Sequence, residues 1–170
     1  MPLKSLRAWL GVEQRAPQEI APLRETLDAL DHLEPGRARH LAAFAYLLGR
    51  VAHADQHVSP EETQAMEALV REQGQLSPDQ AAVVVQLAKT SHLLFAGTAN
   101  FLVAREFAQL AAYEQKLALM RCLFAVSASD DSISVAEEGE IHRIAKELKI
   151  DQPDLVRLRV EYRKHLPGLR

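Results

Sequence analysis

Four carboxylates are the residues best suited to chemistry, and they occur in two copies of one pattern. The first copy contains Asp55 and Glu62, and the second, 75 residues later, contains Asp130 and Glu137. In each copy a β-branched apolar residue follows the Asp by three positions, a Ser by four and the Glu by seven. Oxygen ligands of this kind suit hard divalent cations such as Ca²⁺ or Mg²⁺ better than they suit Zn²⁺.

The same residues also have a purely structural interpretation as helix caps. Ser59 to Glu62 and Ser134 to Glu137 both fit the capping box. In that motif the Ser hydroxyl accepts from the N–H three residues on, and the Glu reaches back to the N–H of the Ser. Each Asp falls near the end of the preceding helix, where it can hydrogen-bond its own turn. Capping requires no function, and the residues taken alone favour it over cation binding.

A cation site would need both copies of the pattern. One turn is shorter than the EF-hand calcium loop of about 12 residues, and it supplies too few oxygen ligands. If the repeats pair, carboxylates from the two turns form a compact acidic surface. The candidate metal ligands are therefore Asp55, Glu62, Asp130 and Glu137. We identify no catalytic residue, because the chain has no phosphate-binding glycine loop, zinc-finger spacing or ordered catalytic triad.

Two histidines flank the first Asp, at His53 and His57, and this spacing would suit zinc or another transition metal. The second copy has Ala128 and Ser132 at the matching positions. The histidines are therefore not part of the shared pattern. Solvent-edge histidines beside an acidic turn are the favoured interpretation.

Composition favours closely packed helices. Of 170 residues, 48% are hydrophobic and only 5% aromatic, and the net charge is −3. An acidic balance argues against nucleic acid as a partner. The single cysteine, Cys122, excludes an internal disulfide and fits a reducing compartment; we assign it to the core. The N-terminus lacks a signal-peptide block and no apolar run reaches about 18 residues, so a cytoplasmic protein without membrane insertion is expected.

Hydrophobic periodicity predicts an all-α fold, a helical bundle built from two pseudo-repeated helix-turn-helix units. Gly74 is expected to end the helix that follows the first turn. The basic run of the last helix is interpreted as a solvated end that complements the helix dipole. The first expected helix begins at Pro17. Further helices are expected at about 37–54, 60–73, 78–94, 101–110, 114–127 and 135–148, and from 151 onwards. The expected divisions are an N-terminal helical extension (1–36) and a helical domain (37–170) with repeat one at about 41–96 and repeat two at about 114–165.

Each copy of the pattern consists of an alanine-rich helix, Ala-Asp or Ser-Asp, a short turn, an apolar residue, Ser and then Glu. This pattern, used twice, resembles the TerB family associated with tellurite resistance. The similarity covers about residues 41–158 and is to stand-alone bacterial members in particular. It implies two paired helical repeats whose acidic residues bind a divalent cation, and these acids correspond here to Asp55, Glu62, Asp130 and Glu137.

The chain departs from the family pattern directly after each Asp. The family usually has Gly there, whereas this chain has Gln56 and Asp131. Asp adopts the left-handed backbone conformation more readily than Gln does. The substitution therefore predicts a first turn shaped differently from the second.

The resemblance implies a non-enzymatic helical module with an acidic, cation-binding face. Such a module would act with protein partners in a stress-response or membrane-associated complex. The alternative is a purely structural protein–protein interaction domain whose acidic residues only cap helices. A metal-dependent hydrolase would need more ligands and a more open cleft than this sequence displays.

Overall fold

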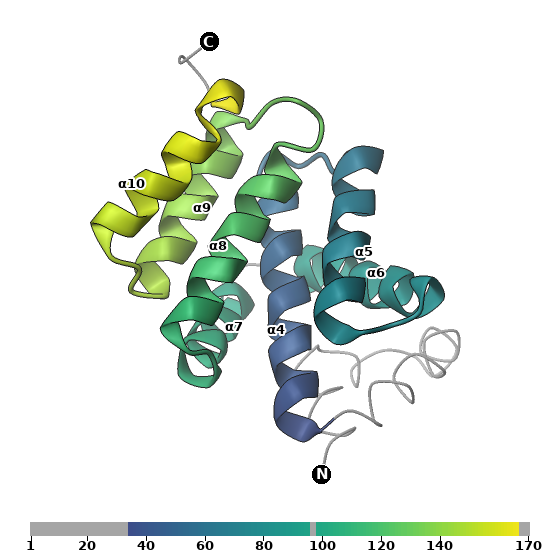
Figure 1. The fold of residues 1–170 in the computed structure, drawn as a ribbon. Helices are drawn as coiled ribbons and strands as arrows, with labels where there is room; N and C mark the ends of the chain where they lie inside the picture. Colours follow the sequence, from purple (N-terminus) through teal and green to yellow (C-terminus); the bar gives the residue numbers. More distant parts are fainter. Residues whose placement is uncertain (1–33, 96–97, 167–170) are drawn as a thin grey trace.

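The structure is a computed structural model that describes residues 34–95 and 98–166. These residues contain helices and turns and no β-strand (Figure 1). The all-α prediction is confirmed. No helix in the described residues is long and apolar enough to cross a membrane. All but the last three residues of the extension expected at 1–36 lie outside the described residues, and the domain division stays a prediction. The elements are α4 (Pro35–Ala52), α5 (Pro60–Gly74), α6 (Pro78–Phe95), α7 (Thr98–Leu110), α8 (Tyr113–Ser127), α9 (Val135–Glu147), α10 (Gln152–Glu161) and the 3-10 turn η3 (Arg163–His165).

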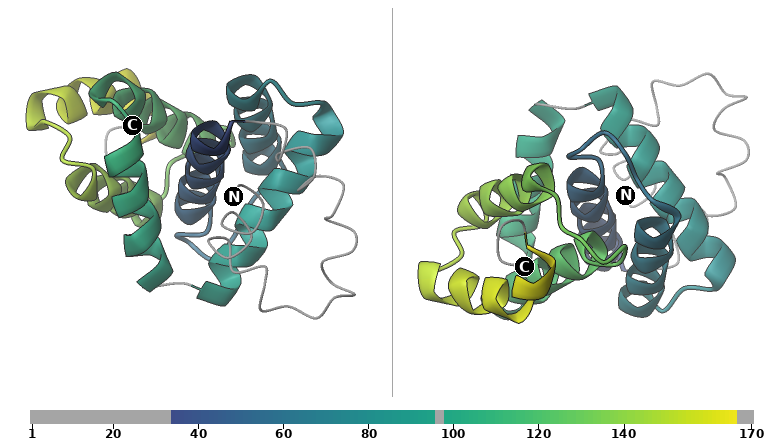
Figure 2. Two further views of the ribbon diagram at one scale, coloured as in Figure 1. Left: turned by 90° about the horizontal axis from the view of Figure 1, so that it is seen from below. Right: turned by 90° about the horizontal axis from the view of Figure 1, so that it is seen from above.

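Helix α4 forms the centre of the bundle. Every residue from Leu41 to Ala52 is buried, and α5, α6, α7, α8 and α9 all pack against this helix. Alanines alternate with larger apolar residues along α4, so large and small side chains can interdigitate with those of its neighbours. Figure 1 shows α5 and α8 on opposite sides of α4, and the end views of Figure 2 show the remaining helices arranged around it.

The two predicted turns have the same backbone hydrogen bonds, shifted by 75 residues. The donor–acceptor pairs are His53–Gly49, Ala54–Val51 and Gln56–His53 in the first turn, and Ala128–Phe124, Ser129–Val126 and Asp131–Ala128 in the second. Gln56 and Asp131 are both left-handed, with φ of 63° and 71°. The expectation of a differently shaped first turn is therefore wrong. The turn holds Gln56 in this conformation although it costs a non-glycine residue about 1–2 kcal/mol.

The repeat continues beyond the second helix of each unit with a shift of 74 residues. Left-handed residues, Gln75 and Lys149, follow α5 and α9. The next N–H in each copy donates to a carbonyl five residues back, from Leu76 at 3.1 Å and from Ile150 at 2.9 Å. The change of one in the shift means that the second copy is one residue shorter between its two turns.

Gly74 does not occupy the left-handed position that ends α5, because Gln75 does. Gly74 is instead the last helical residue, and it is buried. A Cβ atom at this position would lie 2.7 Å from Cδ2 of Leu41. The glycine is therefore required by close packing of α5 on α4 rather than by backbone conformation.

Cys122 lies at the edge of the core, so its assignment to the core is correct only in part. Its side chain is half-buried and packs against the buried cluster. Burial raises the pKa of the thiol to about 11, which keeps it protonated at neutral pH.

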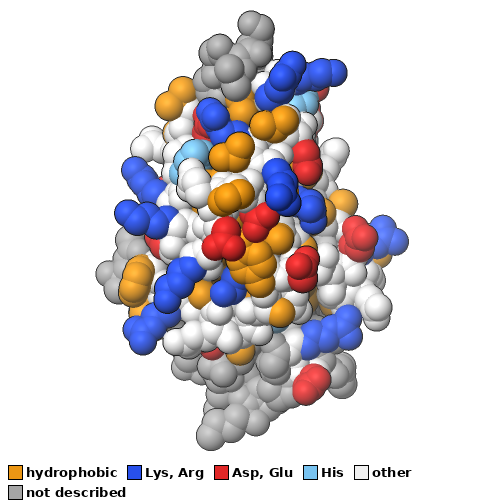
Figure 3. Space-filling view, turned by 60° about the vertical axis from the view of Figure 1, so that its left-hand side comes forward, with side chains coloured by type: hydrophobic (Ala, Val, Ile, Leu, Met, Phe, Trp, Pro, Cys, Tyr) orange, Lys and Arg blue, Asp and Glu red, His pale blue; other side chains and the backbone are white. Residues whose placement is uncertain are grey.

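The basic residues of α10 are partly neutralised at the surface. Arg159 forms an ion pair with Glu138 of α9, and Arg157 forms one with Asp154, one turn earlier. On the face that carries α9 and α10, basic and acidic side chains surround a broken row of apolar groups (Figure 3). This mixture agrees with the interpretation of the basic run as a solvated helix end.

We predict opposite effects of alanine at two glycines. Gly74→Ala should lower the free energy of unfolding by about 1–3 kcal/mol, because the new methyl group would overlap Leu41. Gly139→Ala, at an exposed position of α9, should raise it by about 0.5–1 kcal/mol, because no atom lies within 4 Å of the added Cβ. Urea denaturation of both variants measures this, and a stabilised Gly74→Ala variant would refute the packing argument.

Candidate functional site

The two repeated turns lie side by side at one end of the bundle. Figure 1 shows the α4–α5 turn and the α8–α9 turn together at the top of the view, and the view from above in Figure 2 agrees. The first turns of α5 and α9 therefore meet. Each brings a Ser and a Glu to the same region.

Both predicted capping boxes are formed. At the start of α5, the Ser59 hydroxyl accepts from the Glu62 N–H at 3.0 Å, and the Glu62 carboxyl accepts from the Ser59 N–H at 3.0 Å. At the start of α9 the same two bonds join Ser134 and Glu137 at 3.1 and 2.9 Å. Each box holds the carboxyl group of its Glu against the N–H of its Ser at the start of the helix. The two boxes therefore fix where the Glu62 and Glu137 carboxyl groups lie.

The two capping glutamates also contact each other. Glu62 and Glu137 are each only 1% exposed, and each acts on the pKa of the other through a side-chain hydrogen bond. Two carboxyl groups can share such a bond only if one of them carries a proton. Burial raises the pKa of Glu62, and it raises the pKa of Glu137 to about 8. At neutral pH the pair therefore retains one proton, which we assign to Glu137.

Asp55 and Asp130 lie beside this pair but at the surface. Both are exposed, and each accepts a hydrogen bond from the backbone two residues on, as expected for a capped turn. The charges of both aspartates raise the pKa of Glu62, and the charge of Asp55 also raises that of Glu137. All four predicted residues are thus brought together. The prediction that all four carboxylates form an acidic surface is wrong for Glu62 and Glu137, because the pairing of the repeats buries these two side chains.

The described residues do not form a ready metal site. No group of three or more His, Cys, Asp or Glu side chains within them is arranged to hold an ion. His53 is half-buried and His57 is exposed, and neither belongs to such a group. The arrangement that the structure does show is a buried pair of glutamates flanked by two exposed aspartates.

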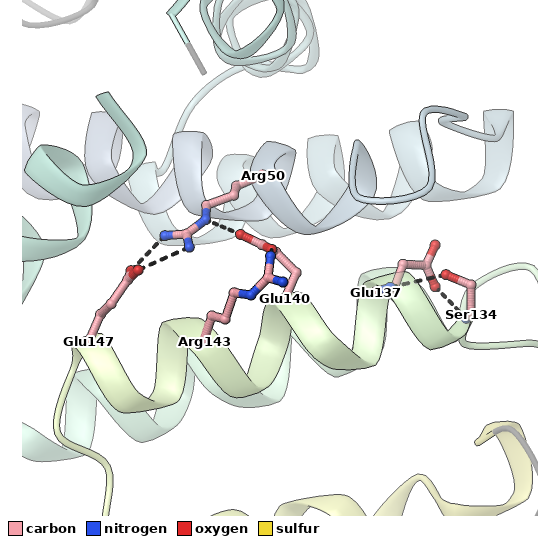
Figure 4. Close-up of polar contacts among 6 residues, drawn as sticks. All are labelled: Arg50, Ser134, Glu137, Glu140, Arg143 and Glu147. Carbon is pink, nitrogen blue, oxygen red and sulfur yellow. Dashed lines mark hydrogen bonds and ion pairs between the residues drawn. The ribbon is translucent and has the colours of Figure 1, made fainter. Parts of the chain in front are cut away.

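Arg50 is the main polar link between the repeats. It was not identified from the sequence as a functional or structural residue. It lies in the buried part of α4 with a side chain only 4% exposed, and it pairs with two glutamates of α9 (Figure 4). Its Nη1 and Nη2 donate to Glu147 at 2.6 and 3.1 Å, and its Nε donates to Glu140. Arg143 pairs with the other oxygen of Glu140, at 3.0 Å.

The signal for this ion pair is present but indirect. Arg50 interrupts an apolar stripe, which suggests a buried charge in need of a partner. Glu140 and Glu147 are seven residues apart, so they lie on one face of α9. Nothing in the sequence pairs them with Arg50, since the positions that match Arg50 and Glu140 in the other repeat are Ala125 and Ala65.

Comparison with known proteins agrees with the repeated pattern. A family model described as tellurite resistance protein TerB matches residues 40–160. The match includes both turns and all four carboxylates, and it nearly coincides with the 41–158 range of the resemblance. No curated protein and no solved structure matched the chain.

We predict that metal-free protein loses stability as the pH rises towards 8. The pKa of Glu137 is about 8 in the folded chain against an ordinary 4.5, so between these values the folded state binds more protons than the unfolded state. The stabilisation is complete below about pH 4.5 and is lost through about pH 8. Each unit of pKa difference corresponds to about 1.4 kcal/mol. Unfolding by urea between pH 5 and about 9 measures the decline.

Glu137→Gln should remove this decline, because the amide N–H replaces the carboxyl O–H while the amide oxygen still caps Ser134. The variant should be at least as stable as the wild type at about pH 9. Glu61→Gln, at an exposed first-turn acid of α5, is the matched control and should keep the wild-type profile. If Glu137→Gln retains the full pH dependence, the shared proton lies elsewhere.

We predict that Arg50→Ala lowers the free energy of unfolding by about 3 kcal/mol, because it leaves Glu140 and Glu147 without their buried cation. Arg143→Ala should change it by less than about 0.5 kcal/mol, since the Arg143 side chain is 75% exposed. Chemical denaturation of both variants measures the difference. Equal effects would show that Arg50 is no more than a surface charge.

Proposed function

The chain belongs to the TerB family, and on this basis we propose that it is a non-enzymatic helical module that binds a divalent cation where its two turns meet. One observation supports the cation site above all: the buried Glu62–Glu137 pair beside Asp55 and Asp130. We further propose that the module acts with protein partners in a cytoplasmic stress-response or membrane-associated complex. That second part rests on the family likeness.

The chemistry of the proposed site is an exchange of a proton for a cation. Within the part of the chain that the structure describes, the groups that act on the pKa of the pair are carboxylates and capping N–H groups, with no basic side chain among them. A proton now relieves the repulsion between Glu62 and Glu137. A divalent cation would relieve it more fully, because it carries two charges and attracts all four carboxylates. The oxygen ligands favour Ca²⁺ or Mg²⁺, with water completing the coordination.

Binding requires side-chain movement. Within the described residues the carboxylates are not yet arranged around a common centre. Asp55 and Asp130 are the members that can move, because both are exposed and each is held through a single oxygen by its own turn. The glutamates are buried and fixed by their capping boxes, so they would provide the rigid part of the site.

A purely structural interaction domain is the second candidate function. The observation that favours it is that both capping boxes are complete, so Ser and Glu already have a role without any ligand. On this alternative the Glu62–Glu137 bond is only the consequence of packing two first turns together. A cation would then have no effect on the protein.

The two candidates differ in how divalent cations affect thermal unfolding. We predict that millimolar Ca²⁺ or Mg²⁺ raises the Tm of the wild type, by mass action on the folded state. At a hundredfold excess over Kd the stabilisation is about 2.7 kcal/mol, which is several degrees for a chain of this length. Because the cation displaces a proton, the rise should be larger at about pH 8.5 than at about pH 6.

The variant Asp130→Asn/Glu137→Gln removes two charges but keeps the turn and cap hydrogen bonds. It should lose the cation-dependent rise in Tm. Glu61→Gln/Glu114→Gln removes two charges from exposed positions outside the site and should keep the rise. The cation site is refuted if the wild type shows no divalent-dependent stabilisation, or if Asp130→Asn/Glu137→Gln shows all of it. Either result would leave the structural alternative.

A further inference from the structure

A groove of about 370 Å³ lies between α7, α8 and the residues that end α9. None of the four paired carboxylates lines it. The described residues that line it are Phe101, Arg105, Ala108 and Gln109 from α7, Lys116 from α8, Glu147 at the end of α9 and Lys149 just after it.

The charge of this groove is positive. Arg105, Lys116 and Lys149 contribute three cations, and none of them forms an ion pair with another residue in 34–95 or 98–166. The carboxylate in the lining, Glu147, is already bound by both terminal nitrogens of Arg50. The chain as a whole carries a net charge of −3, so the positive charge of the groove is local. An anionic group on a ligand would neutralise that charge.

The groove also exposes a large apolar side chain. Phe101 is 55% exposed, and Leu102, the next residue of α7, is 52% exposed. Covering a phenylalanine side chain fully is favourable by about 1.5–3 kcal/mol, so an apolar group on the ligand would add to the charge attraction. The ligand that matches both features carries carboxylates beside a bulky apolar side chain.

We propose that this groove binds a short acidic segment of a partner protein, with an apolar side chain against Phe101 and carboxylates at Arg105, Lys116 and Lys149. A small metabolite is a poorer match, because small-molecule sites enclose their ligand with fixed polar groups, whereas Arg105 and Lys149 are exposed. A membrane surface is a poorer match because the cations surround a hollow. The groove is independent of the cation site, so either proposal can fail without the other.

Selection from a phage-displayed library of random peptides of about twelve residues tests the groove. The wild-type chain and the variant Lys116→Glu/Lys149→Glu are used in parallel. The wild type should enrich peptides in which an aromatic or large aliphatic residue is flanked by Asp or Glu, and the variant should not. Enrichment of basic or uncharged peptides, or of no peptide, would overturn the proposal.

The enriched peptide is then titrated against purified variants by fluorescence anisotropy. Its affinity should fall at least about tenfold in Lys116→Glu/Lys149→Glu and in Phe101→Ser, and it should weaken between about 50 and 500 mM NaCl. Arg71→Glu/Arg121→Glu, at exposed positions outside the groove, is the matched charge reversal and should bind as the wild type does. Thermal melts establish that all variants are folded. Equal loss in both double variants would mean non-specific charge attraction and would overturn the assignment.

Two further measurements distinguish other occupants. Sedimentation with phosphatidylserine vesicles should show no binding that Lys116→Glu/Lys149→Glu abolishes. Light scattering should show the same molar mass for that variant and the wild type. Vesicle binding lost in the variant would assign the groove to a lipid surface, and a dimer lost in the variant would assign it to a second copy of this chain. Either result would overturn the peptide proposal.

Discussion

Two carboxyl groups in contact away from water repel each other strongly when both are ionised, and this repulsion governs the end of the bundle where the repeats meet. Glu62 and Glu137 are brought into contact by the packing of two helix starts, and each is already held by its own serine. Neither side chain can turn away without losing its cap. The repulsion must therefore be relieved by a positive charge, and a proton is the smallest one. This makes the protonation state of the pair part of the fold.

The contact between the repeats combines a symmetric element with an asymmetric one. The turns match bond for bond, so Glu62 and Glu137 play equivalent roles. Arg50 has no counterpart, because its ion pairs run from α4 of the first repeat to α9 of the second. A buried ion pair adds little net stability, but losing one partner is costly. Arg50 therefore disfavours other arrangements of the two units, which their shared turns alone would not exclude.

The cationic groove shows how this arrangement affects the surface. Glu147 would make the groove less positive, but Arg50 binds it from the interior. The same buried arginine that joins the repeats thus leaves the three surface cations as the dominant charge outside. The acidic pair at one end of the bundle and the basic groove are therefore two separate charged features of the molecule.

The sequence by itself determined the helices of the described residues, to within a few residues of their ends, and the two repeated turns, because periodicity and capping boxes act over a few neighbouring positions. It also identified the four carboxylates and the family. The tertiary structure alone decided that Glu62 and Glu137 meet in the interior, and that Arg50 is the link between repeats. These contacts join residues 75 or more positions apart in the chain, and they depend on how the helices cross. Gln56 shows the same limit locally: its own preference opposes a left-handed turn, and the hydrogen bonds of the surrounding turn override it.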